Sequence, residues 1–283
     1  MNKLFILFFS VLLMITPLVM QAKETIYHVQ AEAEKDQYHI DVLTFLFKDD
    51  DNFQLKSISQ NLSGSRQISE LKNGALSVAA FGTSQSLEDD LLPIRIPILK
   101  GLLGHRIFII KKGAQAKFDQ VNTLSALQNL KAGQGVTWSD TKILKNAGFD
   151  VVTTLKYPNL FPMLEGDRFD YFPRALHEPF SEVQARPELN LTIEKRLMLV
   201  YPLALYLFVS PENISLASVI ETKLEAAIAD GRFDEFFYGH PLIQTVLQRS
   251  QIKERKIFRI SNPDLPSNTP LERDELWLSV DNI

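Results

Sequence analysis

The 283-residue sequence contains no cysteine. This absence excludes a disulfide framework and any metal site built on thiolate ligands. Stability has to come from a hydrophobic core instead, and a hydrophobic content of 45% is ordinary for a globular protein. The chain is long enough to form one large domain or two smaller ones.

Positive charge is scattered along the sequence. The 30 Lys and Arg residues against 34 Asp and Glu residues give a net charge of -4, and no run of Lys or Arg is present. Proteins that bind nucleic acid usually carry a clustered basic surface. We therefore expect no nucleic-acid partner.

Common catalytic motifs are missing as well. The sequence has no G-x-S-x-G elbow, no phosphate-binding P-loop and no H-E-x-x-H helix. His105, His177 and His240 lack the spacing of metal ligands. We expect no enzymatic activity, no cofactor and no metal site.

Residues 1–22 have the pattern of a secretory signal peptide. Lys3 gives a positive start, residues 4–19 are mostly apolar, Pro17 interrupts them, and cleavage is expected after Ala22. An uncleaved membrane anchor is the alternative, but the apolar stretch is shorter than the ~20 residues that span a bilayer. No cysteine is available at the cleavage position to carry a lipid. The mature protein is therefore expected to be free in a bacterial periplasm.

Two short apolar stretches bounded by proline and turn residues dominate the middle of the chain, at residues 92–113 and 201–210. Such runs are typical of strands buried on both faces. We interpret them as strands that cross between two α/β lobes and leave a cleft between the lobes. The first lobe would comprise residues 23–110 and 205–283, and the second lobe residues 111–204.

Strand-like and helix-like segments alternate through both lobes. In the first lobe they are expected at 25–30 (strand), 36–47 (helix), 53–58 (strand), 63–72 (helix) and 75–81 (strand). This order implies a parallel sheet with right-handed crossovers. The second lobe repeats the pattern from residue 122 onward. A helix over 215–229, a late strand at 257–260 and an extended arm over 262–283 complete the prediction.

Four motifs follow one another along residues 25–251. They are ELKNGALSVAAFGTSQS with LPIRIPILKGLLGHRIFII, then VNTLSALQNLKAGQGVTWSDT, LEGDRFDYFPR and LEAAIADGRFDEFF. In this order, behind a signal peptide, they resemble type II periplasmic solute-binding proteins, and most closely solute-binding family 3, the polar amino-acid-binding group. The resemblance implies a Venus-flytrap fold whose two lobes close on a small solute.

In one respect the sequence departs from that family. Its amino-acid binders commonly carry an Arg soon after the first-lobe Thr, and this Arg clamps the ligand carboxylate. Here Thr83 is followed by Glu88, Asp89 and Asp90, and the nearest cation is Arg95. The departure argues against a standard α-amino acid as the ligand. The acids either favour a cationic ligand or face water.

Candidate ligand-binding residues lie where predicted strands end, because ligands collect at that edge of open parallel sheets. They are Thr83, Ser84 and Arg95 in the first lobe, and Trp138, Ser139, Asp140, Thr141 and Arg174 in the second. Arg174 carries a fork of donors suited to a carboxylate or phosphate. The alternative for Arg174 is a structural ion pair with Glu178 or Asp170.

The segment Trp138–Thr141 is placed where a strand leads into a helix. The N–H groups at a helix start bind anions, and Trp138 offers a flat apolar wall. Alternatively, Ser139 or Asp140 only caps the helix. Thr83 and Ser84 either donate hydroxyl hydrogen bonds or belong to a plain loop, and Arg106 is expected at the surface.

We therefore expect a monomeric periplasmic protein that closes on a small polar solute, anionic or zwitterionic and possibly amino-acid-like. It would present the solute to an inner-membrane ABC permease. A membrane sensor protein is the alternative partner, and the sequence does not choose between transport and signalling. A lyase or dehydratase activity, which the resemblance also allows on this fold, is the remaining alternative.

Overall fold

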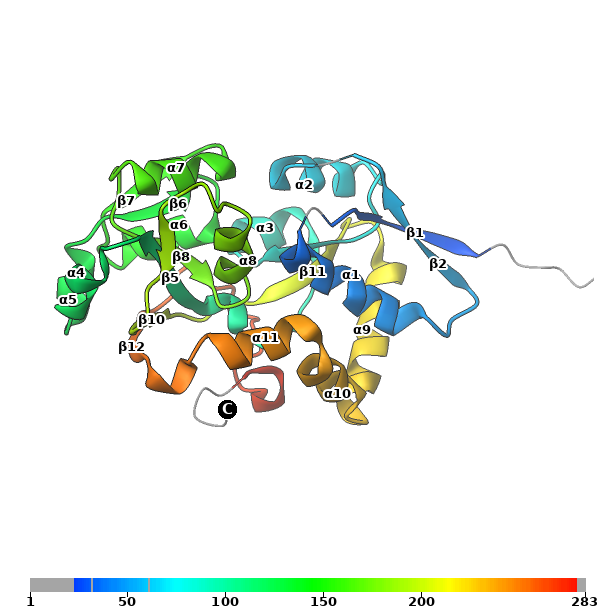
Figure 1. The fold of residues 1–283 in the computed structure, drawn as a ribbon. Helices are drawn as coiled ribbons and strands as arrows, with labels where there is room; N and C mark the ends of the chain where they lie inside the picture. Colours follow the sequence, from blue (N-terminus) through cyan, green and yellow to red (C-terminus); the bar gives the residue numbers. More distant parts are fainter. Residues whose placement is uncertain (1–22, 32, 61, 279–283) are drawn as a thin grey trace, which may run out of the picture.

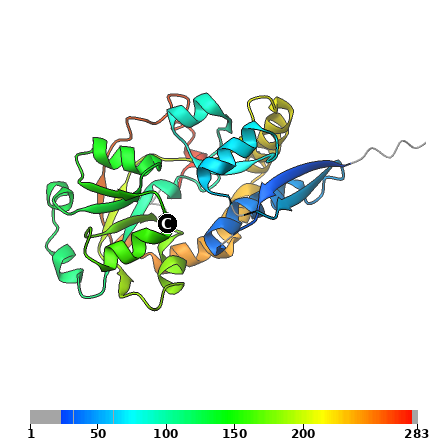
Figure 2. The same cartoon turned by 90° about the horizontal axis from the view of Figure 1, so that it is seen from above.

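The computed structural model describes residues 23–31, 33–60 and 62–278, and they form two lobes of strands flanked by helices (Figure 1). Viewed from above, the two lobes lie side by side (Figure 2). The predicted α/β class with two lobes is confirmed. The expected signal peptide lies outside the described residues. Within the described part of the chain, no helix is long and apolar enough to cross a membrane.

The first lobe contains two small sheets that are joined through Tyr27. Strands β1 (Glu24–Val29) and β2 (Phe53–Ile58) pair in parallel, and β11 (Leu205–Val209) lies between β3 (Ala79–Gly82) and β4 (Leu92–Ile94). The Tyr27 carbonyl oxygen accepts from the amides of Ser77 at 2.8 Å and Val78 at 3.3 Å, just before β3. The helices of this lobe are α1 (Glu34–Phe47), α2 (Gly64–Lys72), α3 (Gln85–Asp90), α9 (Ile214–Ala229), α10 (Arg232–Gly239) and α11 (Pro241–Arg249).

The second lobe is built on one larger sheet. Its strands, in spatial order, are β12 (Lys256–Arg259), β10 (Leu197–Val200), β5 (His105–Lys111) and β8 (Phe172–Ala175), and β9 (Leu191–Ile193) also pairs with β5. The parallel pair β6 (Ala132–Gly135) and β7 (Val151–Thr154) joins β8 through a bridge between Ala132 and Tyr171. Its helices are α4 (Gln115–Asp119), α5 (Leu124–Gln128), α6 (Ser139–Asn146), α7 (Leu160–Glu165) and α8 (Pro179–Gln184). Short 3-10 turns occur at η1 (Leu102–Gly104), η2 (Tyr157–Asn159), η3 (Ile252–Glu254) and η4 (Asp274–Leu276).

The sheets are mixed, whereas the sequence predicted parallel ones. β11 runs antiparallel to β3 and β4, and β5 runs antiparallel to β8, β9 and β10. Each of these two strands enters its sheet directly from the other lobe, without the helical crossover that a parallel neighbour requires.

Two strands also lie in a different lobe from the one expected. The whole of β5 pairs within the second-lobe sheet, so the assignment of residues 105–110 to the first lobe is wrong. β12 pairs with β10, so the chain passes between the lobes a third time after α11. The first two connections are residues 95–104 and 201–204, and the other lobe limits stay a prediction.

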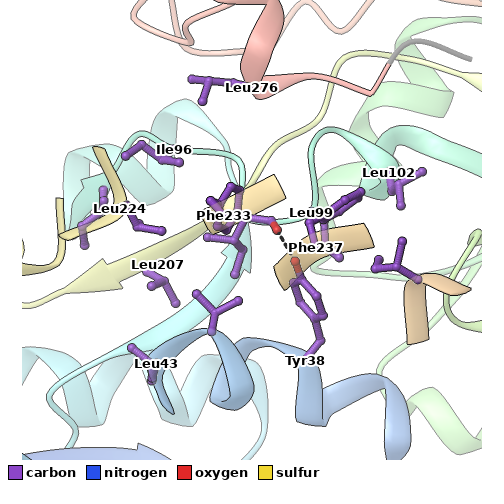
Figure 3. Packing of buried hydrophobic residues seen from close by; sticks show 14 of the residues in the cluster. Tyr38, Leu43, Ile96, Leu99, Leu102, Leu207, Leu224, Phe233, Phe237 and Leu276 are labelled. Atoms are coloured by element: carbon purple, nitrogen blue, oxygen red, sulfur yellow. Dashed lines mark hydrogen bonds between the residues drawn. The ribbon is translucent and has the colours of Figure 1, made fainter. Parts of the chain in front are cut away.

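The first connection is packed into the hydrophobic core (Figure 3). Ile96, Ile98, Leu99 and Leu102 are each no more than 1% exposed. The Tyr38 hydroxyl of α1 donates to the Ile98 carbonyl oxygen at 2.7 Å. Burial raises the pKa of Tyr38 well above its usual value, so the hydroxyl keeps its proton and remains a donor. The path between the lobes is therefore fixed by packing on the side of the first lobe.

The first and second connections touch at Gly104. The Tyr201 amide donates to the Gly104 carbonyl oxygen at 3.1 Å. A Cβ atom at position 104 would lie 1.9 Å from the Tyr201 carbonyl oxygen, which no real contact permits. Only glycine allows the two connections to lie this close.

Replacement of Gly104 by alanine should destabilise the protein by about 2–3 kcal/mol, because the added methyl forces the two connections apart. The free energy of unfolding in urea, followed by circular dichroism, measures this. Gly64→Ala is the matched control, since Gly64 lies in α2 and a Cβ atom there would meet no other segment of the described chain within 4 Å. Equal stabilities of the two variants would contradict the proposed contact.

His105, which follows Gly104, should make stability depend on pH. Burial lowers the pKa of its imidazole, and the charges of Arg259 and Arg106 lower it further, against a hydrogen bond to the Gly101 carbonyl oxygen that raises it. As pH falls below about 6.5, the unfolded chain binds the proton first, so folded stability is lost down to the lower pKa of the folded state.

We expect wild-type protein to lose up to about 1.4 kcal/mol more per pH unit than His105→Asn between pH 6.5 and the folded pKa, the limit for one proton. Urea unfolding of both proteins at pH 7.5, 6.5 and 5.5 measures the difference. Titrations shared by the two proteins cancel in this comparison. Parallel stability curves would show that His105 is not the group responsible.

Candidate functional site

A cavity of about 420 Å³ lies between the start of α3 in the first lobe and α6 in the second. The residues that line it come from both lobes and from the C-terminal arm, residues 262–278. They are Ser84, Ser86, Val136, Thr137, Trp138, Ser139, Thr141, Lys142, Lys145, Asn146 and Asp264. The cavity is open to solvent and mostly polar in character, so it suits a small polar molecule.

Half of the predicted site residues line this cavity. The predicted residues that line it are Ser84, Trp138, Ser139 and Thr141. Their contact with a solute stays a prediction. Ser84 is the N-cap residue of α3, where its hydroxyl oxygen accepts from the Leu87 amide at 3.3 Å. The remaining residues, Thr83, Arg95, Asp140 and Arg174, make polar contacts inside the protein instead.

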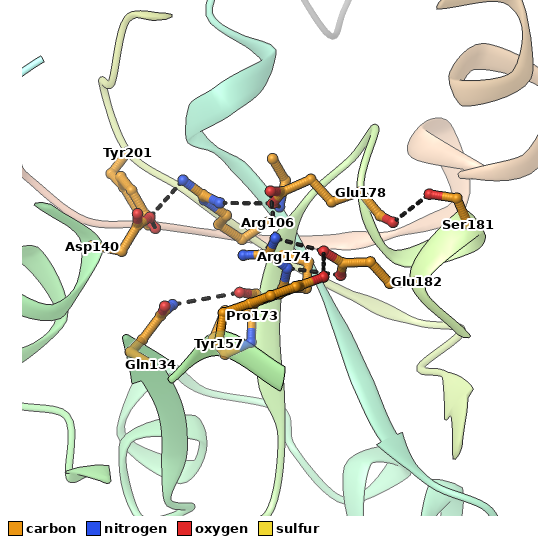
Figure 4. A network of polar contacts seen from close by, with 11 residues as sticks. Arg106, Gln134, Asp140, Tyr157, Pro173, Arg174, Glu178, Ser181, Glu182 and Tyr201 are labelled. Carbon is orange, nitrogen blue, oxygen red and sulfur yellow. Dashed lines mark hydrogen bonds and ion pairs between the residues drawn. The ribbon is translucent and has the colours of Figure 1, made fainter. Parts of the chain in front are cut away.

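Arg174 lies among the carboxylates of Glu178 and Glu182 and the side chain of Tyr157 (Figure 4). It donates to Glu182 from Nε at 2.8 Å and from Nη2 at 2.6 Å, and it also donates to Glu178. Its guanidinium lies 5.0 Å from the ring centre of Trp138 and 4.8 Å from that of Phe172. In this conformation Arg174 forms the structural ion pair with Glu178 that was the alternative to a role in solute binding. A role in solute binding stays a prediction and requires one of these glutamates to move.

Arg106 was expected at the surface, and this expectation is wrong. The residue is 2% exposed, and its guanidinium pairs with Asp140 at 2.5 Å and with Glu178 at 3.4 Å. It also lies 5.6 Å from the ring centre of Tyr201, whose hydroxyl donates to Asp140. These partners are distant from Arg106 in the sequence. No local sequence pattern therefore predicts that Arg106 is buried.

The expected capping role of Ser139 or Asp140 is also wrong. Trp138 occupies the N-cap position of α6, and no side chain makes a cap hydrogen bond there. The Asp140 carboxylate is directed to Arg106 and Tyr201 instead, because these are the donors in its buried surroundings. Asp140 thus ties the first turn of α6, next to the cavity, to β5 and to the second connection between the lobes.

The tyrosines of this cluster act as donors. Burial and the neighbouring Glu182 charge raise the pKa of Tyr157, and burial raises the pKa of Tyr201 well above its usual value. Both hydroxyls therefore keep their protons. Tyr157 donates to Glu182 Oε1 at 2.7 Å. The carboxylates Asp140, Glu178 and Glu182 are thus surrounded by guanidinium and hydroxyl donors, which offsets the cost of burying their charges.

In the first lobe, Glu88 gathers two of the predicted residues. Its carboxylate accepts from the Thr83 hydroxyl at 2.6 Å and from Arg95 at 2.6 and 2.9 Å, and its side chain is 3% exposed. Glu88 thus neither faces water nor offers an unpaired charge to a cationic ligand. Asp89 and Asp90, in contrast, are exposed and face water, as one of the two alternatives expected. Asp89 accepts from the Gln85 side-chain amide at 2.9 Å, and Asp90 pairs with Lys72 at 2.7 Å.

Sequence reasoning missed three charged residues of the cavity wall: Lys142, Lys145 and Asp264. The two lysines follow Ser139 at helical spacing, so the face of α6 that carries Ser139 could have indicated them. Asp264 comes from the C-terminal arm, and no periodic pattern in that segment relates it to α6.

Glu182→Ala should destabilise the protein by about 3 kcal/mol, because it leaves buried donors of Arg174 and Tyr157 without their acceptor. Urea unfolding measures the loss. Glu188→Ala, at an exposed position on the same lobe, is the control and should change stability by less than about 0.5 kcal/mol. A similar small effect of both substitutions would mean that the ion pairs of Arg174 do not hold this region together.

Solved structures with a similar fold are numerous, although no protein-family model and no curated protein sequence matches the chain. A Salmonella typhimurium periplasmic binding protein with high arginine specificity is 16% identical over 81% of this chain and 99% of its own, with a TM-score of 0.56. An ancestral arginine-binding protein bound to glutamine is 15% identical over 77% and 98%, with a TM-score of 0.56. A structure from work on glutathione import and the cystine ABC importer of Streptococcus mutans is 10% identical over 77% and 95%, with a TM-score of 0.57.

Identities of this size establish the fold alone. The likeness extends over most of this chain and nearly all of each of these other chains, so it includes both lobes and not one of them. The chain therefore has the two-lobed fold of type II periplasmic binding proteins, as its four motifs predicted.

Proposed function

We propose that this protein is a periplasmic binding protein that closes on a small polar solute between its lobes. The observation that carries this proposal is the cavity of about 420 Å³ whose wall combines Ser84 and Ser86 of the first lobe with α6 of the second. A solute held there touches both lobes at once. Because those contacts exist together only when the lobes are close, binding shifts the population toward the closed form.

The charges of the cavity wall favour an anionic or zwitterionic solute. Lys142 and Lys145 contribute two positive charges against the single carboxylate of Asp264. The start of α6 adds the positive end of a helix dipole. The hydroxyl groups along the wall supply hydrogen bonds of either polarity, which suits an amino-acid-like or organic-acid solute.

The partner of the closed form would be an inner-membrane ABC permease. Structures of the same fold include the binding protein of an amino-acid ABC transporter, 12% identical over 76% of this chain with a TM-score of 0.52. In this role the protein acts as a monomer in the periplasm, and one solute is released to the permease for each opening of the lobes.

A thermal-shift screen of residues 23–283 tests the proposal. Amino acids, organic acids, short peptides, polyamines and sugars are added, and stabilisation that grows with the logarithm of concentration is expected for anionic or zwitterionic members. Each solute that stabilises the protein should be recovered unchanged by NMR after incubation, whereas an enzyme would consume it.

Lys145→Glu should abolish most of the stabilisation by an anionic solute, because it reverses a charge in the cavity wall. Lys253→Glu makes the same charge change at an exposed position outside the cavity and should leave the shift intact. A panel without any stabilising member, or an equal loss in both variants, would count against solute binding at this cavity.

A further inference from the structure

The C-terminal arm runs from the second lobe to the first (Figure 2). Its later part is firmly held on the first lobe. Arg273 donates to both carboxylate oxygens of Glu225 in α9, at 2.6 and 2.9 Å. The Leu278 amide donates to the Lys100 carbonyl oxygen at 2.8 Å, and Lys100 Nζ donates to the Glu275 carbonyl oxygen at 2.6 Å. This end of the arm is therefore part of the first-lobe structure.

The beginning of the arm is held much less firmly. The side-chain Nδ2 of Asn262 donates to the Pro202 carbonyl oxygen at 2.9 Å in the second connection, and Asp264 pairs with Lys142 of α6 at 2.5 Å. The Lys142 side chain is 60% exposed and that of Asp264 22% exposed. Ion pairs with this exposure contribute little to stability, because water and salt compete for both charges.

The two lysines of the cavity wall differ in their partners. Among the described residues, no carboxylate lies within ion-pair distance of Lys145, whereas Lys142 is occupied by Asp264. Asp264 itself lines the cavity, so its carboxylate stands where an anionic group of a solute would meet Lys142. A solute anion and Asp264 cannot both take the best position against the same ammonium group.

We infer that Asp264 is an internal competitor for the anionic group of the solute, and that Lys142 is the cation for which they compete. This inference rests on the proposed function of the cavity. A carboxylate or phosphate of the solute replaces Asp264 at Lys142, and the beginning of the arm then leaves α6. Asp264 sets how strongly an anion must bind, and binding changes the contacts of the arm between the two lobes.

Binding measurements on Asp264→Asn test the competition. Isothermal titration calorimetry with L-glutamate and with inorganic phosphate as probes, at low salt, should show binding about two- to fivefold tighter than to wild type. Asp230→Asn is the matched control, since Asp230 is an exposed carboxylate paired with Arg232 outside the cavity. Its affinities should equal those of wild type, and the gain in Asp264→Asn should disappear at high salt.

A double-mutant comparison separates competition from a general change in charge. Lys142→Gln should weaken anion binding, and adding Asp264→Asn to it should restore little, because the contested cation is gone. Without any probe, Lys142→Gln should speed hydrogen exchange at the amides of Asp264 and Leu265. Both amides donate to Asn262 at the beginning of the arm, at 3.1 and 3.2 Å.

The outcomes distinguish this inference from the function on which it rests. Equal probe affinities of wild type and Asp264→Asn, with binding present, would overturn the competition and leave solute binding standing. The same gain from Asp264→Asn with and without Lys142 would also overturn it. Absence of binding by wild type and Asp264→Asn alike would count against both the inference and an anionic solute.

Discussion

The buried guanidinium of Arg106 is the group that joins β5, α6 and the second connection to one another. It lies on β5, it packs on Tyr201 of the second connection, and it pairs with Asp140 of α6. Removing one partner of a buried ion pair leaves an uncompensated charge, at a cost of several kcal/mol. The pairing therefore fixes β5, the second connection and the first turn of α6 relative to one another, and α6 forms part of the cavity wall.

The buried ion pairs around Arg106 also extend to the cavity wall through Glu178 and Arg174. Glu178 accepts from Arg106 and from Arg174, so the two guanidinium groups share one carboxylate. Arg174 in turn lies on the ring of Trp138, which lines the cavity. A continuous set of ion pairs and ring contacts thus links Trp138 and α6 to Tyr201 of the second connection.

Periodic patterns predicted the regular elements well, and contacts between distant segments explain the failures. The predicted helix at 215–229 corresponds to α9, and the predicted strand at 53–58 corresponds to β2, because apolar spacing alone defines them. β12 was expected as a strand, but its pairing with β10 depends on register between segments far apart in sequence. The position of Arg106 depends in the same way on Asp140, Glu178 and Tyr201.

The candidate site shows the same division. The positions of Trp138, Ser139 and Thr141 beside a cavity could be predicted, because a strand that leads into a helix places such residues at a sheet edge. Of the internal partners of Arg174, Glu178 was foreseen as one alternative and Glu182 was not, since sequence spacing shows which acids are near but not which way they turn. Asp264 could not be found, because an irregular arm carries no periodicity from which its contacts follow.

The placement of the tryptophans has a practical consequence. The sequence contains only two of them. Trp138 forms part of the cavity wall, whereas Trp277 packs over Gly101 at the first connection and donates from its indole to the Pro270 carbonyl oxygen at 2.8 Å. Tryptophan fluorescence of this protein therefore combines emission from two separate sites. A variant that retains only Trp138 would report on the cavity alone, and one that retains only Trp277 would report on the first connection alone.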